Sequence, residues 1–206
     1  MKLHQHGMRK RLVIGLSGAS GALYGIRLLQ IMAEFPEIET HLVMSKSAER
    51  TISEETDFRP SEVKDMADQY YPVADIGAPI ASGSFRCMGM IIAPCSIRTL
   101  SAVAYCMSDN LLSRAADVML KEKRRLVLLV RETPLHLGHL RAMTAAAEAG
   151  ATIMPPVPAL YNRPATVADM IDHTVGRTLD AVGLDHDLIQ RWGENRAAKK
   201  VADNKQ

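Results

Sequence analysis

Short apolar runs rich in β-branched residues alternate with longer segments of helical periodicity along most of this chain. Parallel strands have this uniformly apolar character because helices bury them on both faces. We predict strands at 12–16, 39–44, 88–93, 126–130 and 151–154. We predict helices at 21–35, 48–56, 97–123, 137–149 and 166–182. The pattern therefore indicates a single α/β domain with a Rossmann-like parallel sheet and helices on both faces.

Residues 57–81 interrupt this regularity with a polar stretch that contains Pro60, Pro72 and Pro79. We predict an irregular connection here, with one short helix at 61–69. At the ends of the chain we expect a basic leader at 1–10 and a polar tail at 194–206 that has little to bury. The α/β domain would then span residues 11–193.

Charge and cysteine content exclude several classes of protein. The 25 basic and 23 acidic residues give a net charge of +2, which is too even for a surface that binds nucleic acid. No stretch approaches the roughly 20 apolar residues of a membrane helix. The three cysteines form no C-x-x-C pair, which favours a reducing compartment. We expect a cytoplasmic protein.

A glycine-rich loop, Gly-Leu-Ser-Gly-Ala-Ser-Gly at 15–21, follows the first predicted strand and opens a helix. Glycines allow tight turning, and unpaired N–H groups at a helix start attract anions. The loop is neither a Walker motif nor a clean G-x-G-x-x-G fingerprint. It indicates a phosphate or cofactor cradle, with a turn that binds no ligand as the alternative.

Two further hydroxyl-rich loops, 81–84 and 94–101, add to this pattern. In open α/β sheets, ligands bind outside the carboxyl ends of the strands, where such loops lie. The three loops therefore predict one ligand crevice. The alternative is that their Ser and Thr residues only cap helices.

Basic residues suggest where a phosphate would bind. Arg114 and Lys121 are seven residues apart in a helical segment, which places them on nearly the same face. Arg131 follows the next strand, and Tyr161 and Arg177 complete a possible anion-binding set. A solvated basic surface is the alternative.

Other catalytic chemistries find no support in the sequence. His136 and His139 lack an H-E-x-x-H context, so we predict no metal. There is no G-x-S-x-G elbow, and Cys95 has no identifiable base beside it.

Taken in order, these segments closely resemble the UbiX/Pad family of flavin prenyltransferases, formerly described as decarboxylase subunits. The resemblance rests on GLSGASGALYG, VMSKSA, ASGSF, APCSIRTLSA, SRAADVMLKE, LVRETP, PPVPALY and a late RWG, and it covers about residues 10–193. It implies a flavodoxin-like or Rossmann-like subunit in a homododecamer with sites between subunits.

The resemblance also implies a role for particular residues. FMN would be held by Gly18, Ala19, Ser20, Ser45, Ser96, Ile97, Arg98, Thr99 and Arg131. Dimethylallyl phosphate would be surrounded by Ser82, Gly83, Arg114, Lys121, Glu132, Tyr161 and Arg177, with Trp192 closing the pocket. Ser20 and Glu55 would handle protons, and Lys121 and Glu132 would also take part in catalysis.

The implied reaction joins the dimethylallyl group to reduced FMN, without metal, and supplies prenylated FMN to a UbiD-type decarboxylase. Two alternatives remain open. A direct FMN-dependent decarboxylase of aromatic acids would require a catalytic histidine early in the first helix, and no histidine lies between Gly7 and Glu39. An FMN-binding accessory subunit would share the flavin site but would have no use for converging phosphate-binding residues.

Overall fold

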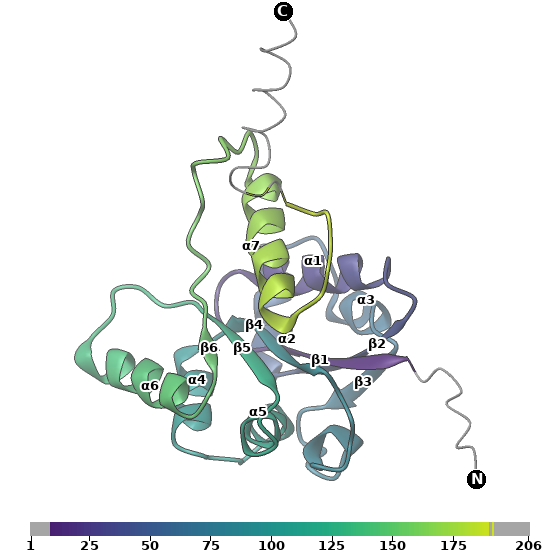
Figure 1. The fold of residues 1–206 in the computed structure, drawn as a ribbon, viewed down its shortest axis with the longest axis vertical. Helices are drawn as coiled ribbons and strands as arrows, with labels where there is room; N and C mark the ends of the chain where they lie inside the picture. The colour runs from purple at the N-terminus through teal and green to yellow at the C-terminus, as the bar shows by residue number, and fades with distance from the viewer. Residues whose placement is uncertain (1–8, 190, 192–206) are drawn as a thin grey trace, which may run out of the picture.

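Six parallel strands form one sheet in the computed structural model, which describes residues 9–189 and 191 (Figure 1). Their order across the sheet is β3-β2-β1-β4-β5-β6. The strands are β1 Lys10–Leu16, β2 Ile38–Met44, β3 Gln69–Pro72, β4 Gly89–Cys95, β5 Arg125–Val130 and β6 Thr152–Ile153. The order reverses between β1 and β4, so the carboxyl ends of these two strands flank the switch point where such sheets bind ligands.

Helices cover both faces of this sheet. They are α1 Ala22–Met32, α2 Lys46–Glu55, α3 Pro60–Asp65, α4 Ile97–Ala104, α5 Leu111–Lys121, α6 Leu137–Glu148 and α7 Val167–Val182, with a short 3₁₀ helix η1 at Pro79–Ala81. One buried cluster joins the sheet to α1, α2, α3 and α7, and a second joins it to α4, α5 and α6. The predicted single-domain, Rossmann-like or flavodoxin-like fold is confirmed.

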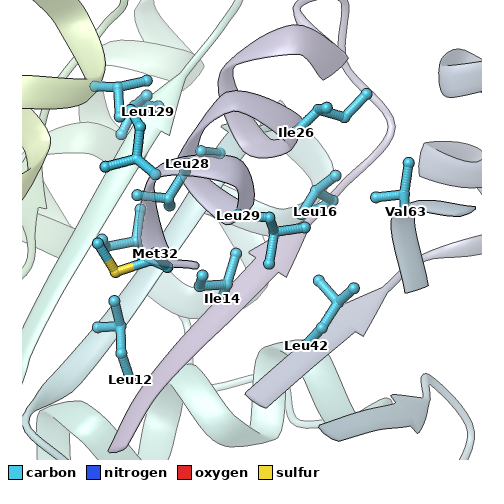
Figure 2. Packing of buried hydrophobic residues seen from close by; sticks show 14 of the residues in the cluster. Leu12, Ile14, Leu16, Ile26, Leu28, Leu29, Met32, Leu42, Val63 and Leu129 are labelled. Atoms are coloured by element: carbon cyan, nitrogen blue, oxygen red, sulfur yellow. The ribbon is translucent and has the colours of Figure 1, made fainter. Parts of the chain in front are cut away.

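Strand β1 shows how the apolar runs build both layers at once. Leu12, Ile14 and Leu16 point toward α1, where Leu29 is among the side chains they meet (Figure 2). Val13 belongs to the cluster on the opposite face. All of these residues are fully buried, because successive side chains of a central strand point to opposite faces that are both covered.

The helical segment predicted at 97–123 consists of two helices, because the chain breaks between α4 and α5. Cys106 adopts a left-handed conformation with φ 56° shortly after α4 ends. Asn110 then starts a new helix, since its side chain accepts a hydrogen bond from the Ser113 N–H at 3.1 Å. An Asn cap inside an otherwise helical pattern is the signal that separates the two helices.

The segment 57–81 is more regular than predicted. Its helix α3 begins with Pro60 at the first helical position and ends at Asp65, short of the predicted 61–69. The edge strand β3 follows, pairing in parallel with β2. Periodicity misses β3 because its four residues, Gln-Tyr-Tyr-Pro, lack the apolar character of a central strand.

The predicted chain ends are largely outside the described residues, which exclude 1–8 and 192–206. The leader at 1–10 and the tail at 194–206 therefore stay predictions. Within the described ranges, no helix has both the length and the apolar character that crossing a membrane requires.

Candidate active site

A cavity of about 540 Å³ lies at the carboxyl ends of the central strands. It falls within the roughly 300–1,000 Å³ that small-molecule and cofactor sites occupy. The loops that follow β1, β2, β4 and β5 all contribute to its wall, with Gly18, Ser45, Ser96, Ile97, Thr99 and Glu132 among the lining residues. Two of the three loops predicted to share a crevice, 15–21 and 94–101, thus meet at this cavity, whereas no residue of the loop 81–84 lines it.

The glycine-rich loop after β1 brings its backbone unusually close to the next loop. A Cβ atom at Gly18 would lie 2.2 Å from the Cβ of Ser47, so no larger residue fits without a shift of the loop. Gly21 has φ 103° and caps α1, a conformation that glycine adopts at no steric cost. The loop therefore presents bare backbone to the cavity at 18 and turns sharply into α1 at 21.

Ser17 connects this loop to the loop after β4, a role that the sequence did not reveal. Its side chain is buried, and its hydroxyl donates to the Pro94 carbonyl at 3.0 Å and accepts from the Ser96 N–H at 2.7 Å. The only sequence signal is a serine at the very end of an apolar strand. Recognising its role requires knowing that β1 and β4 are neighbours.

Ser45 and Ser96 cap the two helices whose starts line the cavity. Ser45 accepts a hydrogen bond from the Ala48 N–H at 3.0 Å, and Ser96 accepts one from the Thr99 N–H at 3.3 Å. The capping interpretation is therefore right for both serines, and it accompanies the crevice rather than replacing it. The positive ends of α2 and α4 meet at the cavity wall, which suits an anionic group.

Glu55 links the end of α2 to the start of α1. Its carboxylate accepts hydrogen bonds from the N–H groups of Gly21 at 2.8 Å and Ala22 at 3.1 Å. Burial raises the pKa of Glu55, but hydrogen bonds from the Ser20 side chain and these N–H groups, with the nearby Arg131, leave the pKa below its ordinary value. The structure thus brings Ser20, Glu55 and Arg131 together around an ionised carboxylate.

The remaining flavin candidates lie on the same rim. Ala19 follows Ser17 in the tight turn after β1, where its N–H donates to the Ser17 carbonyl at 2.9 Å. Arg98 is largely exposed and pairs with Asp109 at 3.1 Å. Glu132 lines the cavity and accepts a hydrogen bond from the Thr133 N–H at 3.0 Å.

A second group of predicted residues lies where α5 meets the segment after η1. Arg114 donates to the Ala81 carbonyl at 3.2 Å, next to Ser82, and pairs with Asp117 at 2.8 Å. Gly83 lies against Lys121, because a Cβ there would be 2.6 Å from the lysine Nζ. The spacing of Arg114 and Lys121 predicted a shared face, and both do contact residues 81–83.

Lys121 is not an isolated cation, since its ammonium pairs with the carboxylate of Glu122. Its side chain keeps 44% of its surface exposed. A bound anion would therefore compete with Glu122 for the same ammonium group.

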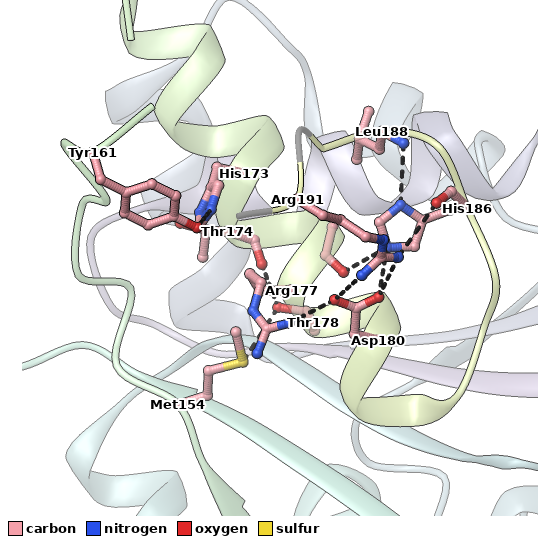
Figure 3. A network of polar contacts seen from close by, with 11 residues as sticks. Met154, Tyr161, His173, Thr174, Arg177, Thr178, Asp180, His186, Leu188 and Arg191 are labelled. Atoms are coloured by element: carbon pink, nitrogen blue, oxygen red, sulfur yellow. Dashed lines mark hydrogen bonds and ion pairs between the residues drawn. The ribbon is translucent and has the colours of Figure 1, made fainter. Parts of the chain in front are cut away.

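A third group gathers along α7 (Figure 3). The Tyr161 hydroxyl lies 2.9 Å from His173 Nε2, and Arg177 donates to Asp180 at 2.7 Å. Burial of the imidazole lowers the pKa of His173, and the positive charge of Arg177 adds to the same shift. Trp192, which the resemblance places at the pocket entrance, lies outside the described residues.

One chain does not bring the whole predicted phosphate-binding set together. Arg114 and Lys121 project from α5, while Arg177 projects from α7, and these helices cover opposite faces of the sheet (Figure 1). The physical reason is the layered architecture, which separates the two helices by the thickness of the sheet. These cations therefore do not converge on one phosphate within a single chain.

The candidate metal ligands and the cysteines are spread over the described residues. No group of three or more His, Cys, Asp or Glu side chains in these ranges is arranged to hold a metal ion. The three cysteines carry free thiols, and burial raises the pKa of Cys95. The rings of His136 and His139 lie against each other at the start of α6, with centroids 3.6 Å apart and planes inclined by 35°.

Comparison with known proteins points to one family. A family model described as Flavoprotein matches residues 2–178. A protein of Escherichia coli named flavin prenyltransferase UbiX is 60% identical over 185 residues, which are 89% of this chain and 98% of that protein.

Two crystal structures agree with this. The structure of AnUbiX in complex with FMN and dimethylallyl pyrophosphate superposes with a TM-score of 0.88 at 51% identity, covering 90% of this chain and 98% of the other. A dodecameric FMN-dependent UbiX-like decarboxylase from Escherichia coli gives a TM-score of 0.86 at 48% identity, covering 88% and 98%.

Proposed function

This chain belongs to the UbiX flavin prenyltransferases of the flavoprotein family, and we propose that it joins the dimethylallyl group of dimethylallyl phosphate to reduced FMN. The observation that carries this proposal is the cavity at the switch point of the sheet, where the glycine-rich loop after β1 meets the N-termini of α2 and α4. The relative AnUbiX, at 51% identity, was crystallised with FMN and dimethylallyl pyrophosphate. Both the geometry of the cavity and the sequence identity to AnUbiX therefore support the proposed function.

The residues at the cavity fit a flavin phosphate and ring. Gly18 allows close backbone approach, Ala19 and Ser20 continue the same loop, and Ser45 and Ser96 stand at positive helix ends. The stretch Ser96–Thr99 lines the same cavity, and the Arg131 N–H donates to the carbonyl of Cys95, next to Ser96, at 3.0 Å. When bound and reduced, FMN would supply the electron-rich nitrogen 5 and carbon 6 to which the dimethylallyl group is joined as its carbon–oxygen bond to phosphate breaks.

Loss of phosphate from the prenyl donor places extra negative charge on the leaving group, which fixed cations stabilise. Arg114 and Lys121 from α5 supply two of these cations, and Arg177 on α7 supplies a third. Because α5 and α7 cover opposite faces of one chain, we propose that a neighbouring subunit completes the site. The dodecamer of the Escherichia coli relative provides such neighbours.

Proton movement falls to the carboxylates at the cavity. Glu55 is ionised because its pKa lies below its ordinary value, so it holds no proton to donate, and the Ser20 side chain that hydrogen-bonds to it is the group through which a proton would pass. Glu132 places a second carboxylate on the cavity wall. Tyr161, Ser82 and Gly83 complete the proposed donor-binding set.

The test is an anaerobic incubation of the flavin-loaded protein with dimethylallyl phosphate, followed by mass spectrometry of the released flavin. We expect a flavin heavier by one five-carbon prenyl unit. A parallel reaction with dimethylallyl diphosphate tests the choice of donor, and activity only with the diphosphate would overturn the monophosphate. Unmodified FMN from folded protein would instead support an accessory subunit or a direct decarboxylase.

Variants separate prenyl transfer from flavin binding. Lys121→Ala should abolish transfer yet keep most FMN affinity, because Lys121 contacts residue 83 rather than the flavin cavity. Lys64→Ala is the matched control, since Lys64 is also an ion-paired lysine but binds Glu49 on another part of the surface. An unchanged turnover rate in Lys121→Ala would refute its role.

We further propose that the product serves a UbiD-type decarboxylase, as the resemblance implies. A cytoplasmic location is the accompanying proposal, supported by the three free thiols. Activation of an inactive UbiD-type decarboxylase by the reaction mixture, and by no mixture that lacks the prenyl donor, would be the direct test.

A further inference from the structure

The chain after α7 folds back along the helix that carries Arg177. Gly183 ends α7 in a left-handed conformation with φ 75°, and Leu184 is then buried. Further on, Ile189 packs so closely on α7 that a Cβ at Gly176 would lie 2.4 Å from its Cγ2. We call residues 184–189 and 191 the return segment.

Asp180 joins the return segment to Arg177 (Figure 3). Its Oδ2 accepts from Arg177 Nη1 at 2.7 Å and from Arg191 Nη1 at 3.1 Å. Its Oδ1 accepts from Arg191 Nη2 at 2.9 Å and lies 3.2 Å from His186 Nε2. One carboxylate thus holds two guanidinium groups from different parts of the chain.

The surroundings of the Asp180 carboxylate favour its ionised form. Hydrogen bonds from Arg191 hold the pKa of Asp180 below its ordinary value, against an opposing effect of burial, and the charges of Arg191 and Arg177 add to the lowering. Its side chain is only 19% exposed. An ionised, fixed Asp180 makes a rigid anchor for Arg177, whose own side chain is 53% exposed.

His186 fixes the geometry of the return segment without adding a full charge. The Leu188 N–H donates to His186 Nδ1 at 3.1 Å, so Nδ1 carries no proton. The proton therefore sits on Nε2, which donates to the Gly176 carbonyl at 2.8 Å. Two arginines and one aspartate then leave a net single positive charge around Asp180.

We propose that Asp180 is a positioning residue for the prenyl donor, because it holds the guanidinium of Arg177 in the orientation that binds the phosphate. The orientation of Arg177 then depends on whether the return segment is packed on α7. This inference rests on the proposed function, in which Arg177 binds the phosphate. An arginine held in one orientation loses less conformational freedom on binding than a free one. The coupling follows because Arg191 holds the same carboxylate that holds Arg177.

The sign of one measurement separates positioning from simple charge. Replacing Asp180 by Asn removes a negative charge near an anionic substrate, so charge alone predicts tighter binding of the phosphate and a lower KM. Positioning predicts the opposite, because Arg177 loses its anchor. We expect Asp180→Asn to raise the KM for dimethylallyl phosphate by roughly 3- to 10-fold, the effect of freeing one long side chain.

The experiment compares variants of the assembled, FMN-loaded protein. Asp172→Asn is the matched control, since Asp172 is also on α7 but pairs with Arg27 instead. We expect its KM to stay within about twofold of the wild type, and FMN affinity to be unchanged in both variants. Hydrogen exchange of residues 184–189 should accelerate in Asp180→Asn only.

The possible outcomes are distinct. A wild-type protein that makes no prenylated FMN would refute the proposed function, and the positioning role with it. An active wild type with an equal or lower KM in Asp180→Asn would refute positioning alone. If Asp180→Asn does not fold, Arg191→Met takes its place: it must raise both the KM and the exchange of 184–189, and an unchanged KM would refute the coupling.

Discussion

Replacing Ser17 by Ala tests whether the hydrogen bonds between the loops after β1 and β4 prepare the flavin cavity. The substitution removes the hydroxyl that accepts from the Ser96 N–H at 2.7 Å and donates to the Pro94 carbonyl at 3.0 Å. The Pro94 carbonyl keeps a second partner, because it also accepts from the Ser17 N–H at 3.1 Å. Only the Ser96 N–H is left without a protein partner.

The cost then depends on whether water reaches that N–H group. A buried donor left unpaired costs about 1–3 kcal/mol. Ser96 is only half-buried in the protein alone, so water can replace the hydroxyl and the loss should be near 1 kcal/mol. A flavin in the cavity excludes that water and moves the cost toward 3 kcal/mol. The difference of about 2 kcal/mol should weaken FMN binding roughly 30-fold.

Two assays measure these quantities separately. Urea unfolding at one fixed protein concentration, with and without FMN, gives the stability difference, and quenching of flavin fluorescence gives the affinity. Ser53→Ala is the control, because the Ser53 hydroxyl donates to the Glu49 carbonyl at 3.2 Å on an exposed helix surface. An FMN affinity of Ser17→Ala within twofold of the wild type would refute the reasoning.

Three further predictions follow from the packing and charges of the same region. Gly18→Ala should weaken FMN binding by about 1–3 kcal/mol, because its Cβ would lie 2.2 Å from the Cβ of Ser47 and displace the loop. The same fluorescence titration measures this loss. An unchanged affinity would show that the loop accommodates the methyl group without disturbing the flavin site. Gly25→Ala should destabilise the fold by about 1–3 kcal/mol in urea while leaving the flavin contacts in place, since its Cβ would lie 2.3 Å from the Ala93 carbonyl oxygen. Glu55 has a lowered pKa in the folded protein, so it stabilises the fold above its unfolded pKa, and that contribution is lost as pH falls through the folded value. Unfolding from pH 7 down to pH 3 should therefore show a shallower loss of stability in Glu55→Gln than in the wild type, and identical slopes would contradict the assignment.

The order of apolar runs was enough to predict the architecture. The central strands β1, β2, β4 and β5 were all predicted, because buried parallel strands must be apolar on both faces. The elements that escaped prediction are those whose signals are local and polar. The edge strand β3 lacks an apolar run, and the break between α4 and α5 depends on the conformation of Cys106 and the cap at Asn110.

The sequence also indicated the ligand crevice, since glycine- and serine-rich loops follow the predicted strands 12–16 and 88–93. What it left open was whether those serines cap helices or face a ligand. Ser45 and Ser96 cap helices at the wall of the cavity, so the two interpretations describe the same residues.

Contacts between distant segments were decided only by the tertiary structure. The spacing of Arg114 and Lys121 placed them correctly on one side of α5, because helical periodicity is local. Whether Arg177 joins them depends on which face of the sheet α7 covers, and no local pattern contains that information. The same holds for Ser17, which bonds residues 94 and 96, and for Asp180, which holds both Arg177 and Arg191. Periodicity and burial fix the elements from their own residues, whereas these contacts depend on how the elements pack together.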